Sequence, residues 1–99
     1  MKKDQPTPNE VALKLVDFYD QPFGGKAAGR FRISPKNLRK LTQRRRLSDD
    51  FVRQLADAMF ELEYVFIDME SFYVVTSSRT FTNYRRVADT MVAQSNHLS

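Results

Sequence analysis

Cysteine is absent from the sequence, and histidine occurs once, at His97. Without cysteine the chain forms no disulfide framework, no thiolate nucleophile and no cysteine-based zinc site. His97 lies close to the carboxyl end of the sequence, where chains usually fray, so paired-histidine and multi-histidine metal chemistry is also excluded. The absence of cysteine and the single histidine predict a protein that is not an enzyme and that carries no metal and no cofactor.

Long apolar segments are lacking as well. No uninterrupted apolar run exceeds four residues, whereas a membrane-spanning helix needs about 20. Lys2 and Lys3 resemble the start of a secretion signal, but Asp4-Gln5-Pro6 follows where such a signal has its apolar core. The sequence therefore predicts a cytoplasmic protein with no membrane contact.

The composition is that of one soluble globular domain, with 99 residues, 41% of them hydrophobic and 28% charged. Glycine is rare, and its three copies all lie in the segment 23–29, Phe-Gly-Gly-Lys-Ala-Ala-Gly. This segment has neither a dinucleotide-binding pattern nor a P-loop pattern, and no strand precedes it. We interpret it as a connector.

Acidic residues are missing from one part of the chain. Residues 30–47 carry a net charge of +8, because eight basic side chains occur there without an acid: Arg30, Arg32, Lys36, Arg39, Lys40, Arg44, Arg45 and Arg46. By contrast, residues 1–29 are neutral, residues 48–78 carry −6 and residues 79–99 carry +2. A block of +8 attracts a polyanion, and arginine, which supplies six of the eight charges, suits phosphate geometry.

The first helix is predicted over residues 7–19. Thr7 and Glu10 have the spacing of a capping box, and Pro8 stands at the first helical position. The apolar residues behind this start fall on one face of a helix: Val11, Ala12, Leu15, Phe18 and Tyr19. Asp20-Gln21-Pro22 ends the helix.

Further elements follow in order along the chain. They are a short strand at 30–33, a helix that Ser34 and Pro35 begin, a turn at 42–47, a helix at 49–63 capped by Ser48, and a hairpin made of 64–69 and 72–76. The hairpin tip falls near Glu70-Ser71, and a two-residue turn and a four-residue loop both fit it. A last helix is expected to open at Thr80 or Thr82.

This order of elements resembles the winged helix-turn-helix fold, in which a hairpin wing follows a pair of helices. The match covers residues 11–76, and small one-domain regulators of bacteria, phages and mobile elements look like this. The resemblance implies an α+β domain at 7–78. A flexible arm at 1–6 precedes this domain, and an added carboxyl-terminal helix and tail follow it at 79–99.

The resemblance also implies double-stranded DNA as the partner, and a role as a small transcriptional regulator or accessory DNA-binding factor. In this family the second helix of the pair usually enters the major groove. Here that helix would present Arg53 and Gln54 to base edges. The helix and the wing are acidic, however, so we expect the main contacts to come from the eight basic residues of 30–47. These residues would grip phosphates with little direct base reading.

Other readings of these charged surfaces stay open. The acidic helix 49–63 and the wing predict, as the alternative function, a module that docks onto another protein. The arginines at 44–46 either face a polyanion or pair with the nearby acids Asp49, Asp50 and Glu61. RNA binding is less favoured, because too few aromatic residues accompany the basic ones to form a stacking platform. Phe60, which lies off the apolar stripe, either packs under the first helix or marks a partner surface.

The last expected helix carries more apolar residues than one thin stripe. Tyr84, Val87, Ala88 and Met91 share a face, which predicts a homodimer formed through this helix. The alternative is that the helix folds back onto the helix at 7–19 and completes a monomer core.

Overall fold

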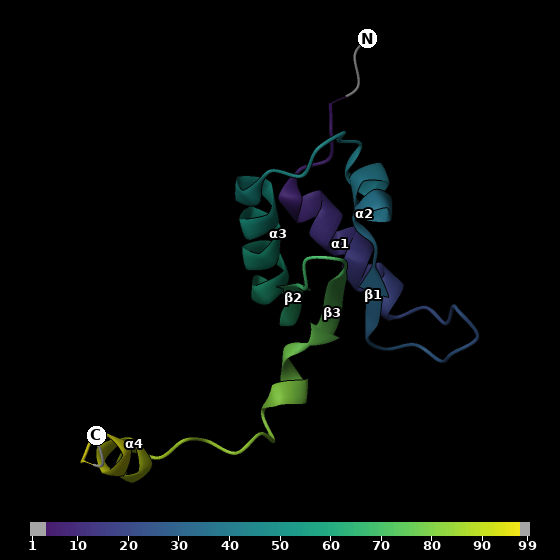
Figure 1. Cartoon of the computed structure of the whole chain (residues 1–99). Coiled ribbons are helices and arrows are strands. Elements are labelled where there is room, and N and C mark those ends of the chain that lie inside the picture. The colour runs from purple at the N-terminus through teal and green to yellow at the C-terminus, as the bar shows by residue number, and fades with distance from the viewer. Residues whose placement is uncertain (1–3, 98–99) are drawn as a thin grey trace.

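The structure is a computed structural model that describes residues 4–97. Over these residues the chain forms four α-helices, one 3-10 helix and one three-stranded antiparallel sheet, so the α+β class is confirmed (Figure 1). The elements are α1 (Pro8–Tyr19), β1 (Phe31–Ile33), α2 (Pro35–Thr42), α3 (Asp49–Glu61), β2 (Tyr64–Asp68), β3 (Tyr73–Ser77), the 3-10 helix η1 (Ser78–Phe81) and α4 (Asp89–His97). Within the described residues no helix is long and apolar enough to cross a membrane.

The first three helices begin at the caps that the sequence indicates. The hydroxyl of Thr7 accepts a hydrogen bond from the backbone N–H of Glu10, and the Glu10 carboxylate accepts one from the N–H of Thr7, which completes the capping box. The hydroxyls of Ser34 and Ser48 cap α2 and α3 without a reciprocal bond, accepting from the N–H groups of Asn37 and Phe51 at 3.1 Å. These bonds satisfy N–H groups that have no partner inside a helix.

The sheet has the order β1-β3-β2, with β3 in the centre. β3 pairs with β1 so that Ile33 faces Tyr73, and it pairs with β2 as a hairpin in which Phe66 faces Val75. The hairpin loop has four residues, 69–72, one of the two lengths predicted, and its Met69 N–H donates to the Phe72 carbonyl at 2.9 Å.

The core lies between the helices and one face of the sheet. α1 packs against α3, and α3 packs against β2. The buried apolar residues come from both helices, α2 and the sheet: Val11, Ala12, Leu15, Leu38, Phe51, Leu55, Ala58, Met59, Phe66, Tyr73 and Val75. Each large aliphatic side chain buried in this way stabilises the fold by about 1.5–3 kcal/mol.

The carboxyl-terminal segment differs from the prediction of a helix from Thr80 or Thr82. Residues 78–81 form η1, and α4 begins only at Asp89. Tyr84 and Val87 lie between the two, 64% and 70% exposed, so neither residue completes a monomer core. An amphipathic helix is stabilised mainly by packing of its apolar face. Figure 1 shows α4 at the end of an extended segment, away from α1, and its apolar residues Met91 and Val92 are more than half exposed.

The segment before α1 is held more firmly than the flexible arm predicted for residues 1–6, of which 1–3 lie outside the described residues. Pro6 is buried, and its carbonyl accepts a hydrogen bond from Arg44 at 2.8 Å. The side-chain amide of Gln5 donates to the carbonyl of Gln43, also at 2.8 Å. Both bonds tie this segment to the turn after α2.

Candidate nucleic-acid interface

The turn between α2 and α3 is set by the end of α2. Gln43 adopts the left-handed conformation, with φ 56° and ψ 36°, and this ends the helix after Thr42. The next N–H, that of Arg44, then donates back to the carbonyl of Arg39 at 3.0 Å. This arrangement is a common way to stop a helix and reverse the chain. It brings the basic residues of the turn next to those in the last turn of α2.

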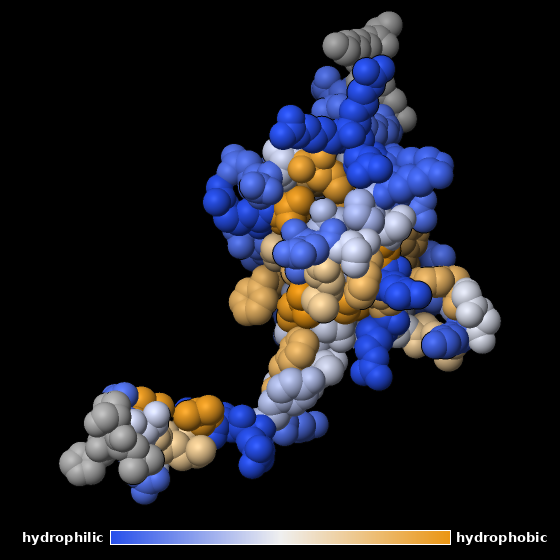
Figure 2. All heavy atoms as spheres, in the orientation of Figure 1, coloured by the Kyte–Doolittle hydropathy of each residue, from blue (hydrophilic) through white to orange (hydrophobic). Residues whose placement is uncertain are grey.

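A shallow basic hollow of about 380 Å³ results. Its lining residues come from α2 and the turn, and all except Gln43 are cationic: Lys36, Arg39, Lys40, Gln43, Arg44 and Arg45. No carboxylate lines it. Figure 2 shows hydrophilic side chains gathered over α2 and the turn, while apolar side chains lie between α2 and α3. The sequence-predicted cations of residues 36–45 are therefore brought together on one surface.

Arg44 has a structural role that sets it apart from its neighbours. Its guanidinium group lies 4.0 Å from the centre of the Phe51 ring and donates to the carbonyls of Pro6 and Thr42, at 2.8 and 3.0 Å. One side chain thus joins the amino-terminal segment, α2 and α3. The sequence does not distinguish Arg44 from Arg45 and Arg46, but in the structure Arg44 is half-buried and the other two are exposed. A guanidinium group that finds carbonyl and aromatic partners is stable when half-buried.

Arg45 and Arg46 are exposed, and neither forms an ion pair with an acid in the described part of the chain. Of the acids expected to pair with the turn arginines, Asp50 instead pairs with Arg53, three residues along α3. The two arginines thus keep their charges free to attract a polyanion.

The basic surface continues from α2 onto β1. Arg30 and Arg32 are both exposed, and Arg32 points away from the face that carries Phe31 and Ile33. The Arg32 guanidinium lies 5.5 Å from the centre of the Phe72 ring. Arg32 also lines a second hollow together with Lys40, which lines the basic hollow as well. Lys40 therefore links the cations of β1 to those of α2 and the turn.

The two residues expected to read bases stand elsewhere. Arg53 and Gln54 are exposed on α3 and line neither hollow. Asp57 and Glu61 are exposed on the same helix, so the outer side of α3 would face phosphates with repulsive charges. α3 is therefore less suited to a DNA backbone than α2 and the turn are.

Other chemistry has little support in the described residues. They contain no group of three or more histidine, cysteine or carboxylate side chains that could hold a metal ion. Burial raises the pKa of the Tyr73 hydroxyl, with a smaller contribution from Asp68. A tyrosine with a raised pKa stays protonated at neutral pH and is a weak nucleophile. Tyr64 is affected in the same direction, also mainly by burial.

Sequence reasoning missed the apolar lining of the second hollow. Phe18, Phe23 and Leu41 come from α1, the connector and α2, and no spacing in the sequence marks them as neighbours. The residues expected to form a dimer lie in the carboxyl-terminal segment, with Tyr84, Val87 and Ala88 before α4 and Met91 within it, all exposed. Comparisons of the chain with protein-family models, with curated proteins and with solved structures gave no match.

Proposed function

We propose that this protein binds double-stranded DNA through its phosphate backbone, using the surface formed by β1, α2 and the turn that follows α2. The observation that carries the proposal is the basic hollow, in which five cations converge without a carboxylate. Arg46, exposed in the same turn, adds a further charge that has no ion pair within the described residues. Arginine and lysine side chains that neutralise phosphates release counterions, and this release favours binding.

The order of the elements supports a winged helix-turn-helix domain. A helix and a short strand precede the pair α2 and α3, and the hairpin of β2 and β3 follows. β1 pairs with β3, the central strand, so β1 and the hairpin of β2 and β3 form one sheet. In the usual docking of such a domain the second helix of the pair enters the major groove. The charges on α3 favour a different orientation, with α2 and the turn against the backbone.

This orientation supports binding that tolerates many sequences. Contacts to phosphates fix position and carry no base information directly. Arg53 and Gln54 are left as the side chains able to touch base edges from α3. We therefore propose a small regulator or accessory factor whose affinity comes mainly from the basic surface.

A charge-reversal experiment tests the proposal. The Lys36→Glu/Lys40→Glu variant changes two residues of the basic hollow. The Lys14→Glu/Lys26→Glu variant makes the same change in net charge at exposed positions that line neither hollow. We expect the first variant to bind a labelled duplex at least about tenfold more weakly than the second, because repulsion replaces two phosphate contacts. Equal weakening in both variants would show that only net charge matters.

Phe60 favours a second candidate function, docking of another protein onto α3. Its side chain is 67% exposed, so it does not pack under α1, and the acids Asp57 and Glu61 flank it. An exposed aromatic residue among charges is typical of a partner surface. Replacing both acids in the Asp57→Asn/Glu61→Gln variant distinguishes the two functions of α3. DNA affinity rises if α3 lies against the backbone and stays unchanged if α3 faces away from the DNA, the orientation that leaves it accessible to a protein partner.

We also propose that the carboxyl-terminal segment forms a homodimer. Tyr84, Val87, Met91 and Val92 are each more than half exposed. Figure 2 shows apolar side chains on α4, where this copy of the chain leaves them uncovered. Association with a second copy would cover them, and two DNA-binding domains would then act together.

A further inference from the structure

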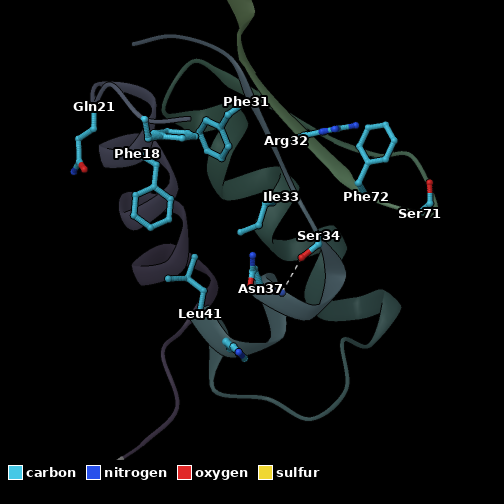
Figure 3. Close-up of a pocket in the computed structure, with 12 residues that line it drawn as sticks. Phe18, Gln21, Phe31, Arg32, Ile33, Ser34, Asn37, Leu41, Ser71 and Phe72 are labelled. Atoms are coloured by element: carbon cyan, nitrogen blue, oxygen red, sulfur yellow. Dashed lines mark hydrogen bonds between the residues drawn. The ribbon is translucent and has the colours of Figure 1, made fainter. Parts of the chain in front are cut away.

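The second hollow is an apolar groove of about 920 Å³ between the carboxyl-terminal part of α1, the connector, β1, α2 and the hairpin loop. Its floor is formed by Phe18, Phe31, Ile33 and Leu41, whose side chains Figure 3 shows turned toward one another across the opening. The ring of Phe31 occupies the centre, with Phe18 edge-on to it at 6.2 Å and Phe23 edge-on at 5.6 Å between ring centres. Aromatic walls of this kind suit a flat apolar ligand.

The connector places Phe23 at the mouth of this groove. The chain turns sharply after Phe23 because Gly24 and Gly25 take positive φ values of 61° and 74°, which side-chain-bearing residues rarely adopt. The N–H of Lys26 donates to the Phe23 carbonyl at 3.1 Å and closes the turn. The Phe23 ring nevertheless remains 49% exposed. A ligand in the groove would cover the open side of this ring.

The rim of the groove is cationic. Arg32 and Lys40 line it, and none of its lining residues is acidic. Arg32 extends toward the Phe72 ring at the hairpin-loop end of the groove, away from Phe18 and Leu41 (Figure 3). Asn37 adds a side-chain amide that has no hydrogen-bond partner among the described residues. The groove thus combines an apolar floor with positive charge and a free amide at its edge.

We propose that this groove binds a small organic anion with a flat apolar body, of the class of an aromatic carboxylate. The rings of Phe23 and Phe31 would contact the body, while Lys40 would attract the carboxylate. Ligand pockets typically have volumes of about 300–1,000 Å³ and a few polar groups in a mostly apolar lining. The groove meets both conditions, and its one-sided charge selects against neutral and cationic ligands of the same shape.

Occupation of the groove would also regulate DNA binding, an effect that rests on the proposed function. Lys40 belongs to the surface proposed to contact phosphates. A carboxylate bound to it removes positive charge from that surface and competes for the same side chain. By linkage, DNA would lower the affinity for the anion by the factor by which the anion lowers the affinity for DNA.

Titration of the isotope-labelled full chain with 2-naphthoate, followed by amide chemical shifts, tests the site without DNA. We expect the shifts to concentrate at Phe31, Ile33, Asn37 and Leu41. The uncharged analogue 2-naphthamide should bind about two- to fivefold more weakly, since the ion pair with Lys40 is lost. Shifts confined to other residues such as those of α4, no shifts at millimolar naphthoate, or equal binding of the amide would overturn the proposal.

Two matched variants on α2 test the role of the rim. Lys40→Gln should weaken naphthoate binding about two- to fivefold, the effect of removing one half-exposed charge pair. Lys36→Gln removes the same charge one turn earlier, outside the groove, and should leave the affinity unchanged. Equal weakening in both would overturn a specific role for the rim. An acidic peptide that contains phenylalanine serves as a competitor. If this peptide displaces naphthoate at a concentration lower than the naphthoate concentration, the groove is a peptide site instead.

Competition with a labelled duplex tests the regulatory step separately. We expect saturating 2-naphthoate to lower DNA affinity in the wild-type chain and to have less effect in Lys40→Gln. If naphthoate binds the groove but DNA affinity does not change, the regulatory step is wrong and the site stands. If the chain does not bind DNA, the proposed function fails, while the chemical shifts still decide on the site.

Discussion

Replacing the three turn arginines one at a time should separate a structural residue from two binding residues. Arg44 donates to the carbonyls of Pro6 and Thr42 and lies over the Phe51 ring. Arg44→Ala removes two charge-assisted hydrogen bonds and a cation–π contact, which together should lower the free energy of unfolding by about 2–4 kcal/mol. In a domain of this size 1 kcal/mol shifts the melting temperature by about 4–8 °C. We therefore expect Arg44→Ala to melt at least about 8 °C below the wild type.

Arg45 and Arg46 serve as the matched controls. Both are exposed and make no ion pair within the described residues, so Arg45→Ala/Arg46→Ala should change the free energy of unfolding by no more than about 1 kcal/mol in total. The same variant should flatten the slope of log K against log salt by about two units, at about 0.9 per lost phosphate contact. Circular dichroism gives the melting temperatures and duplex titration gives the slopes. An Arg44→Ala variant that melts like the wild type would refute the structural role.

Three further predictions concern the core, a cap and the carboxyl-terminal segment. Burial raises the pKa of Tyr73, so the unfolded chain loses this proton first as the pH rises. The free energy of unfolding should therefore fall above about pH 10. In alkaline urea titrations Tyr73→Phe should reduce this fall, whereas Tyr84→Phe, at an exposed position, should not. Ser48→Ala removes the bond to the Phe51 N–H and should cost about 1 kcal/mol in the same assay, and an unchanged midpoint would contradict the cap. Sedimentation at tens of micromolar should show a dimer that Tyr84→Ala/Met91→Ala weakens; a monomeric wild type would refute the dimer.

The local signals that start helices were predictable because they depend on neighbouring residues. Thr7, Ser34 and Ser48 each cap a helix at the position that the sequence indicates. After Glu63 the spacing of apolar residues changes from that of a helix to that of a strand, and this change likewise predicted the hairpin of β2 and β3. The pairing of β1 with β3 was not predictable, because it joins segments about forty residues apart and leaves no periodic trace in the sequence.

In the candidate site, too, local features were predictable from the sequence and long-range contacts were not. The charge of residues 30–47 can be counted in the sequence, but three consecutive arginines look alike there. Which of them turns inward depends on the left-handed conformation of Gln43 and on the Phe51 ring from another helix. The apolar residues of the carboxyl-terminal segment predicted a helix from Thr80 or Thr82. No α-helix forms over residues 82–88, and α4 begins only at Asp89.

Salt titration of the wild-type chain with a short labelled duplex tests the central claim most directly. If four to six cations of β1, α2 and the turn contact phosphates, the affinity should fall about 150- to 2,000-fold between about 50 and 200 mM salt, and it should do so for duplexes of unrelated sequence. A change of less than about tenfold over the same range, or no binding at the lower salt concentration, would contradict phosphate binding by this surface.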